Sequence, residues 1–192
     1  IGLLTDHVPL KNVSALITEK LIMEKARLMN ESLIKDFRLQ RPKIAVLGIN
    51  PHCGDKGVIG TEDDDIVRPA LKKLYFDENI LVFGPFAADS FFGSQTYRNY
   101  DAVLAPYHDQ GLIAFKTIAF GNGVNYTAGL SKVRTSPDHG TAYEIAGKDI
   151  ADPQSFRQAI YTALDVFRNR EEYAELTKNP LKIRTLELEK DK

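Results

Sequence analysis

The sequence predicts an α/β protein built on a parallel sheet. Short apolar runs at 1–4, 44–48, 80–83 and 101–105 have the length and composition of buried strands. Amphipathic segments separate these runs, and that alternation is typical of βαβ units. Hydrophobic residues make up 43% and charged residues 27% of the 192 residues, as expected for a globular domain.

The helices in the first half of the chain follow from periodicity and capping. Apolar residues recur near helical spacing after the first strand, with Ser14 as a candidate N-cap and Pro42 as the stop. A second helix is expected from about Glu62 to Tyr75, ahead of the third strand. Pro85 is expected to end that strand, since proline donates no ladder hydrogen bond.

The second half of the chain has a different pattern. Residues 111–135 contain several glycines and short apolar runs, which predict strands and turns more than helix. Asp152 and Pro153 indicate a helix start, an N-cap followed by proline at the first helical position. One apolar stripe follows: Phe156, Ile160, Ala163, Leu164 and Phe167. The charged tail after Lys178 is expected to fray or to form an edge element.

Composition excludes several classes of function. A net charge of −1 argues against nucleic acid or a strongly charged membrane surface as partner. No apolar run approaches the ~20 residues of a membrane span, and the single cysteine, Cys53, forms no intrachain disulfide. Without a recognisable signal peptide, a cytoplasmic location is expected. Because the chain opens at Ile1 in a strand-like run, we expect a fragment lacking its amino-terminal portion.

Three of the four histidines follow apolar runs that resemble strands. They are His7, His52 and His108. Carboxyl ends of parallel strands lie at one edge of a sheet, so these imidazoles could converge there and bind a divalent metal. None of the three belongs to a short ligand motif, so spacing alone favours the alternative that each is an ordinary loop residue.

Other polar residues stand among apolar and glycine neighbours. Lys116, Asn125 and Arg134 could hold a phosphate or carboxylate, with surface positions as the alternative. Asp89 and Asp109 follow strand ends, where a carboxylate can orient a metal-binding imidazole or accept a proton. For Asp89, an N-cap role is the alternative.

The chain has no standard nucleotide-binding loop. Gly121 and Gly123 begin a pattern like G-x-G-x-x-G, but Tyr126 replaces the third glycine, and no P-loop lysine is present. At 139–147 a His-Gly turn leads into an expected short helix. Backbone N–H groups at such a helix start suit an anionic or polar ligand, although an ordinary capped helix is the alternative.

Six short motifs follow one another along the chain, and their order is as informative as their residues. They are Thr5–Leu10, Gly48–Gly54 with Gly60–Glu62, Gly84–Asp89, Tyr107–Gly111, Gly121–Asn125 and Arg134–Ala142. Together they resemble the 4-hydroxythreonine-4-phosphate dehydrogenases of pyridoxal phosphate synthesis, from residue 1 to about residue 170. The resemblance implies the fold of the isocitrate and isopropylmalate dehydrogenases. Residues 1–146 would be the second, metal- and substrate-binding domain, and residues 147–192 a helix and tail returning to a mostly missing first domain.

The resemblance also implies roles for individual residues. The implied metal ligands are His7, His52 and His108, with zinc the most suitable ion and magnesium or cobalt as alternatives. The implied substrate contacts are Lys116, Asn125 and Arg134. The implied catalytic residues are Asp109, Asp89 and Lys116. The implied NAD-binding residues are His139, Gly140, Thr141 and Ala142. A homodimer with the active site at the subunit interface is also implied.

The implied reaction is an NAD-dependent, metal-assisted oxidation of 4-phosphooxy-L-threonine, a phosphorylated small molecule. Decarboxylation to 3-amino-2-oxopropyl phosphate follows, as a step of pyridoxal 5'-phosphate (vitamin B6) biosynthesis. Cys53, Pro106 and Ala114-Phe115 depart from the commonest family wording. A dehydrogenase of a phosphorylated four-carbon sugar acid, erythronate or threonate 4-phosphate, is therefore the closest alternative. Because the family's substrate-binding His-Thr pair lies outside this chain, a catalytically inactive metal-binding fragment is the second alternative. The third is a purely structural domain that binds no metal.

Overall fold

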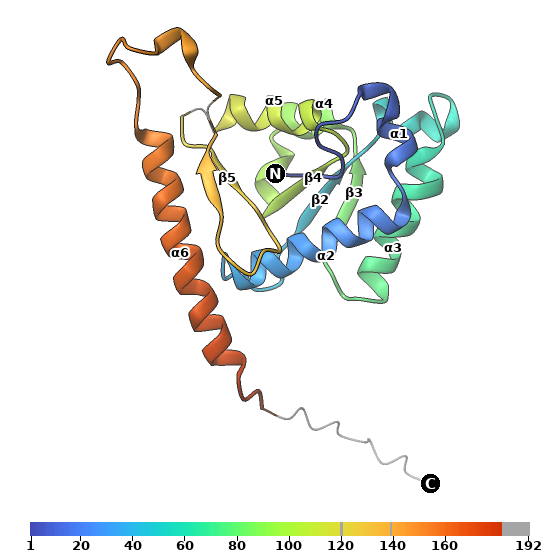
Figure 1. Ribbon diagram of the computed structural model, residues 1–192. Helices are drawn as coiled ribbons and strands as arrows, with labels where there is room; N and C mark the ends of the chain where they lie inside the picture. Colours follow the sequence, from blue (N-terminus) through green and yellow to red (C-terminus); the bar gives the residue numbers. More distant parts are fainter. Residues whose placement is uncertain (120, 139, 182–192) are drawn as a thin grey trace.

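A parallel sheet forms the centre of the protein. The computed structural model describes residues 1–119, 121–138 and 140–181 (Figure 1). Its four-stranded sheet has the order β1-β4-β2-β3, and every pairing is parallel. The strands are β1 (Gly2–Leu3), β2 (Ile44–Leu47), β3 (Val82–Phe86) and β4 (Ala102–Ala105). The expected α/β class with a parallel sheet is confirmed.

Helices cover both faces of the sheet, and alternation along the strands divides the core into two layers. Ile44 and Val46 belong to one buried cluster, formed with α1 (Val13–Leu16), α2 (Glu19–Lys35) and α3 (Arg68–Phe76). Ala45 and Leu47 belong to the other, against α4 (Ala88–Gly93) and the 3-10 turn η4 (Thr96–Asn99). Because both faces are buried, the strands read as continuous apolar runs.

The first helical region is broken in two. The expectation of one helix capped by Ser14 is wrong, because α1 ends at Leu16 and a new N-cap starts α2. The Thr18 hydroxyl accepts a hydrogen bond from the backbone N–H of Leu21 at 3.1 Å, as an N-cap does. Ser14 instead donates its hydroxyl to Glu62 at 2.9 Å. The helix α2 ends at Lys35, well before Pro42.

The third strand runs through its proline. The chain reaches β3 by a π-helical turn, η3 (Asp63–Val67), and α3. The expectation that Pro85 ends the strand is wrong, since β3 continues to Phe86. β3 is the last strand of the sheet and pairs only with β2. On an edge strand, a residue without an N–H removes no internal ladder bond.

A helix replaces part of a segment expected to be strands and turns. Residues 111–118 belong to α5 (His108–Ile118), so the expectation is wrong there. Gly111 explains why a glycine sits inside this helix: an added Cβ would lie 3.0 Å from the side chains of Ile1 and Leu3. The expectation holds further on, where β5 (Val124–Tyr126) and β6 (Thr135–Pro137) form an antiparallel pair, called the ribbon below.

The long helix α6 (Gln154–Thr177) packs on the ribbon and on α2, as Figure 1 shows. The expected helix is confirmed and begins one residue later than expected. The Asp152 carboxylate accepts the Gln154 N–H at 2.8 Å. The expected apolar stripe of α6 lines an open groove of about 370 Å³ beside Val133 and Pro137.

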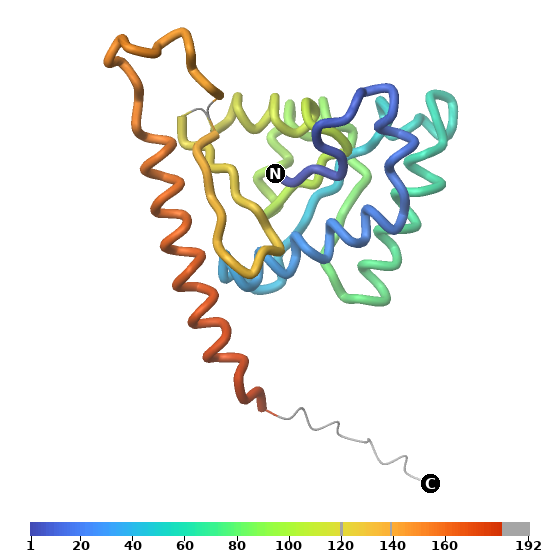
Figure 2. The backbone as a smooth tube through the Cα atoms, viewed as in Figure 1, coloured from blue at the N-terminus to red at the C-terminus, as the bar shows by residue number. Residues whose placement is uncertain are grey.

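The remaining segments are short turns and a projecting loop. The 3-10 turns are η1 (Leu10–Asn12), η2 (Pro51–Gly57) and η5 (Tyr143–Ile145). Figure 2 shows the chain between the ribbon and α6 standing away from the rest of the protein. The tail after Lys178 falls mostly in residues 182–192, outside the described residues. In the described part of the chain, no helix has the length and apolarity needed to cross a membrane.

Candidate active site at the carboxyl edge of the sheet

Two of the candidate histidines lie side by side because their strands are neighbours. His7 follows β1 and His108 begins α5 directly after β4, and β1 pairs with β4. The ring centroids are 5.4 Å apart. Buried Thr5 fastens the two segments together, since its hydroxyl donates to the carbonyl of Pro106 at 2.8 Å and its N–H donates to the same oxygen at 3.1 Å.

A carboxylate completes this group. Ligand atoms of Asp6, His7 and His108 all lie within 4.8 Å of one another. Asp6 and His7 are exposed and His108 is partly buried, so the group opens to solvent. Two imidazoles and a carboxylate are a donor set that zinc accepts, with further positions left for other ligands. Sequence reasoning missed Asp6, although it adjoins His7 in the first motif.

Asp109 fixes the orientation of the His108 ring. The Nδ1 atom of His108 lies 2.8 Å from a carboxylate oxygen of Asp109. An ionised carboxylate only accepts hydrogen bonds, so this contact favours the neutral tautomer with the proton on Nδ1, which leaves the lone pair of Nε2 for a cation. The carboxylate of Asp109 thus contacts the His108 imidazole, and its orienting role toward a metal stays a prediction.

His52 lies outside this group. It sits exposed in η2 with a left-handed backbone, φ 52°. Positive φ values continue through Gly57, so this loop turns with the hand opposite to an ordinary helix. Only glycine fits at Gly54, because a Cβ there would lie 2.2 Å from the carbonyl oxygen of Gly60. The structure thus brings together two of the three histidines predicted as metal ligands.

A buried aspartate holds the His52 loop in place. Asp63 is fully buried and accepts hydrogen bonds from the backbone N–H groups of Ile49 at 2.8 Å and Asn50 at 2.9 Å. The neighbouring Glu62 accepts from its own backbone N–H, from Asn50 and from Ser14, and these bonds hold the pKa of Glu62 below its ordinary value. Sequence reasoning missed Asp63 and gave Glu62 no role beyond its place in the second motif. The only other signal was an acidic run, 62–65, which is equally typical of a solvated face.

Two further groups border this loop. The side-chain amide of Gln110 donates to the carbonyl of Gly48 at 2.9 Å and so joins α5 to the start of the loop. Its Oε1 atom is buried without a hydrogen-bond partner among the described residues. Cys53 is partly buried. Burial, followed by the nearby Asp63 charge, raises the pKa of its thiol, which suits a packing residue more than a zinc ligand.

The candidate substrate residues lie on α5 and around the ribbon. The ammonium of Lys116 donates to the carbonyl of Asp138 at 3.4 Å and lies 3.8 Å from its carboxylate. Asn125 is exposed on β5, opposite Ser136. Arg134 donates to the Thr127 hydroxyl at 2.8 Å. Lys116 follows His108 by two turns of α5, a rise of about 12 Å, so one helix joins the histidine group to the ribbon.

The remaining candidates stand apart from this arrangement. Asp89 is exposed in the first turn of α4, whose N-cap is Ala87, so its alternative N-cap role is wrong. Gly140, Thr141 and Ala142 lie in the projecting loop, where η5 is a single 3-10 turn instead of the expected short helix. The expected NAD contact His139 lies outside the described residues.

Fold and site together define an α/β protein with two histidines and an aspartate gathered at the carboxyl edge of a parallel sheet, where such sheets bind ligands. Comparison with known families is more specific. The model of the family described as pyridoxal phosphate biosynthetic protein PdxA matches residues 1–163, and the chain belongs to this family. The resemblance carried by the six motifs is thereby confirmed.

Two curated relatives that match this chain carry the same name. The chain is 50% identical over 182 residues to a 4-hydroxythreonine-4-phosphate dehydrogenase of Bacteroides thetaiotaomicron, covering 95% of this chain and 50% of that protein. It is 49% identical over 170 residues to the enzyme of the same name from Prosthecochloris aestuarii, covering 88% of this chain and 50% of that protein. The chain therefore spans about half the length of these relatives.

Solved structures agree on the fold. A 4-hydroxythreonine-4-phosphate dehydrogenase from Klebsiella pneumoniae matches with a TM-score of 0.73 and 35% identity, covering 85% of this chain and 50% of that chain. A terephthalate 1,2-cis-dihydrodiol dehydrogenase from Burkholderia xenovorans matches with a TM-score of 0.67 and 31% identity, covering 85% of this chain and 51% of that chain. The same fold thus occurs in proteins named for two different substrates.

Proposed function

We propose that the full-length protein oxidises 4-phosphooxy-L-threonine with NAD and releases carbon dioxide, giving 3-amino-2-oxopropyl phosphate for pyridoxal 5'-phosphate synthesis. The observation that carries this proposal is the family match over residues 1–163, which includes every residue of the candidate site. The convergence of Asp6, His7 and His108 at the sheet edge supports it, since oxidation of a hydroxyl group benefits from a nearby cation.

Asp6, His7 and His108 would hold a divalent cation, zinc by the nature of the donors. His52, which lies outside this group in the structure, is proposed as a further ligand. Such an ion supplies Lewis-acid polarisation of the substrate hydroxyl and of the carbonyl that replaces it. Asp109 would accept the Nδ1–H of His108 and so leave the Nε2 lone pair for the ion. Asp89 and Asp109 are the proposed proton-handling carboxylates, because both follow strand ends at this edge.

Lys116, Asn125 and Arg134 bind the anionic groups of the substrate. Lys116 already pairs with the carboxylate of Asp138, so a substrate phosphate or carboxylate would take over an existing anionic position. Arg134 contributes a planar guanidinium suited to a bidentate contact with such a group. Asn125 contributes an amide that can donate to an oxyanion without adding charge. Lys116 thereby neutralises the negative charge of the substrate group that lies farther from His108.

The NAD cofactor is assigned to the segment His139, Gly140, Thr141 and Ala142. The exposed position of Gly140 and Thr141 supports this, because a large ligand can reach the segment. A homodimer with its active site at the subunit interface is part of the same proposal. The solvent-open histidine group leaves room for a residue of a second copy.

Side-by-side turnover tests the substrate. Full-length protein is assayed for NADH formation with 4-phosphooxy-L-threonine and with erythronate 4-phosphate. We expect a preference of at least about tenfold for the amino substrate, since a site built to pair a polar group discriminates strongly against its absence. The reverse preference would assign the protein to the sugar acid phosphates instead. Full activity after treatment with a chelator would remove the metal from the mechanism.

Metal content tests the ligands without relying on activity. Elemental analysis compares the parent protein with His7→Ala, His52→Ala and His108→Ala. We expect about one zinc-like ion per subunit in the parent and a loss in each variant, because removing one ligand weakens a site of few ligands severely. If His52→Ala keeps its metal while the other two lose it, the ligand set is Asp6, His7 and His108.

A further inference from the structure

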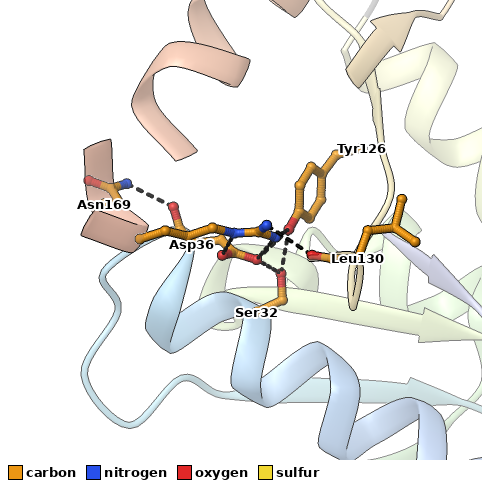
Figure 3. A network of polar contacts seen from close by, with 6 residues as sticks. Ser32, Asp36, Tyr126, Leu130 and Asn169 are labelled. Atoms are coloured by element: carbon orange, nitrogen blue, oxygen red, sulfur yellow. Dashed lines mark hydrogen bonds and ion pairs between the residues drawn. The ribbon is translucent and has the colours of Figure 1, made fainter. Parts of the chain in front are cut away.

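A buried polar network joins α2, the ribbon and α6 (Figure 3). At its centre the guanidinium of Arg170, on α6, donates to both carboxylate oxygens of Asp36, at 2.6 and 3.2 Å. Arg170 also donates to the Tyr126 hydroxyl at 3.1 Å and to the Leu130 carbonyl at 2.9 Å. The Tyr126 and Ser32 hydroxyls donate to the same carboxylate.

The position of Asp36 explains why it needs so many partners. It is the C-cap of α2 and only 2% exposed. A carboxylate at a helix carboxyl end opposes the helix dipole, and a buried carboxylate loses its hydration. Burial by itself raises the pKa of Asp36, but hydrogen bonds from Arg170, Tyr126 and Ser32 outweigh it and hold that pKa below its ordinary value. The carboxylate therefore stays charged and bound to Arg170.

The network grips the ribbon next to the candidate substrate residues. Tyr126 lies between Asn125 and Thr127 in the chain, and Thr127 receives the Arg134 side-chain bond. The Thr127 N–H also donates to the Arg134 carbonyl at 3.1 Å. Leu130 lies in the connection between β5 and β6. Through Tyr126 and Leu130, Arg170 thus contacts both the strand that carries Asn125 and the connection that leads to Arg134.

We propose that Arg170 is a positioning residue for the ribbon. Through Asp36 and Tyr126 it sets the orientation of the ribbon, and with it the positions from which Asn125 and Arg134 contact the substrate. This proposal rests on the substrate contacts assigned under the proposed function. Arg170 itself touches no reacting group, so its effect passes entirely through the ribbon.

The other end of the ribbon is held separately. Ser155 on α6 donates its hydroxyl to the Gly123 carbonyl at 3.0 Å and accepts the Asp138 N–H at 3.0 Å. Thr135 lies opposite Tyr126 in the ladder, at the end that Arg170 contacts, and donates to the Ala159 carbonyl at 2.8 Å. Loss of Arg170 therefore frees β5 and the β5–β6 connection at that end, while Thr135 keeps β6 attached and Ser155 keeps the far end attached. The expected consequence is a misplaced binding surface on a folded protein.

The chain offers a matched control for Arg170. Arg38, two residues after Asp36, pairs with Glu172, two residues after Arg170, at 2.7 Å. This second ion pair joins the same two segments but is about half exposed, with side chains 54% and 44% accessible. Neither Arg38 nor Glu172 makes a hydrogen bond to the described part of the ribbon. Comparing variants of the two arginines separates the effect of the Arg170 contacts to the ribbon from the effect of attaching α6 alone.

Steady-state kinetics of the full-length protein with 4-phosphooxy-L-threonine compare Arg170→Ala, Arg170→Lys and Arg38→Ala. We expect Arg170→Ala to raise KM about tenfold or more with a smaller change in kcat, because a small displacement of binding groups has large effects. Arg170→Lys recovers part of the loss, since lysine restores charge without the planar fork. Arg38→Ala stays within about twofold of the parent. Equal KM shifts for both alanine variants, or a loss confined to kcat, would overturn the proposal.

Hydrogen exchange supplies a readout that needs no activity. The Thr127 amide should exchange at least about tenfold faster in Arg170→Ala, while the Leu4 amide, bonded to Ala105 in the sheet, keeps its parent rate. If Arg170→Ala does not fold, Tyr126→Phe takes its place, with a smaller KM rise in the same direction. An unchanged exchange rate of the Thr127 amide in Arg170→Ala overturns the positioning proposal. Failure of the parent protein to turn over 4-phosphooxy-L-threonine refutes the proposed function instead, and the exchange measurement still applies in that case.

Discussion

The sheet and the ribbon–α6 unit are held by different kinds of contact. In the sheet, aliphatic side chains fill both faces, and Ile44, Val46 and Leu104 are almost completely buried. In α6 only Ala159 and Val166 are buried hydrophobics, and the apolar stripe lies open in a groove. Polar contacts from Arg170 and the other α6 residues described above supply much of its attachment to the rest of the chain.

This difference bears on how the candidate site is assembled. Apolar burial is strong but non-directional, so it sets where the sheet edge lies. Hydrogen bonds and ion pairs have defined geometry, so they set the angle of the ribbon. The histidine group depends mainly on the first kind of contact, and the candidate substrate residues of the ribbon region, Asn125 and Arg134, on the second. Substitutions in the sheet should therefore lower the stability of the whole fold, whereas substitutions in the ribbon–α6 unit should disturb the structure locally.

The largest effect is expected in the sheet. Leu104→Ala removes a buried side chain from the central strand β4, and we expect the free energy of unfolding to fall by about 2–5 kcal/mol. Urea denaturation measures this loss, with Leu176→Ala, at a position 70% exposed, as control. Equal losses at both positions would show that the sheet is not the more tightly packed region.

Acid should act mainly on the ribbon–α6 unit. Since the pKa of Asp36 is lowered by folding, its contribution is present above the ordinary value of 3.8 and is lost as pH falls through the lower folded pKa. Exchange of the Thr127 amide should accelerate in that range before the sheet amides do. Glu62 and Glu78 also have lowered pKa values, so the difference between parent and Asp36→Asn isolates Asp36. The same acid response in both proteins would contradict this assignment.

A smaller effect is expected from the bridge at the other end of the ribbon. Ser155→Ala removes a hydroxyl that joins Gly123 to Asp138, and the free energy of unfolding should fall by about 1 kcal/mol, as for one neutral hydrogen-bonding group. Thermal unfolding measures it. Thr177→Ala, which removes an exposed hydroxyl bonded within α6 at 2.7 Å, is the matched control and should change less.

The smallest effect is expected from the exposed ion pair. Arg38→Ala breaks the contact with Glu172, and the free energy of unfolding should change by about 0.5 kcal/mol or less, because solvent screens exposed pairs. Raising the salt concentration should reduce even this difference. A loss as large as that of Arg170→Ala would mean that exposure does not distinguish the two pairs.

The sheet was predictable because its signals are local. Apolar runs located all four strands, and their order along the chain was enough to expect His7 and His108 at one edge. The α5 helix was missed because Gly111 looks like a turn signal, whereas it marks a close approach of helix to sheet that only the tertiary structure reveals. The course of β3 through Pro85 likewise depends on its position at the edge of the sheet.

The site was predictable only where neighbouring strands bring residues together. Asp6 could have been found from its place beside His7. The Asp36–Arg170 pair could not, because 134 residues separate its members and each looks like an ordinary surface charge. The backbone of the His52 loop was equally hidden, since positive φ at non-glycine residues has no reliable sequence signal.

The β3 edge of the sheet also affects how copies of this protein behave in concentrated solution. An unpaired strand edge is a template on which another chain can add, and long flat edges promote aggregation. Here β3, at one edge, carries Pro85, which has no N–H to donate. That edge supports no regular ladder with a neighbouring molecule, so it resists edge-to-edge growth without a charged residue in the strand.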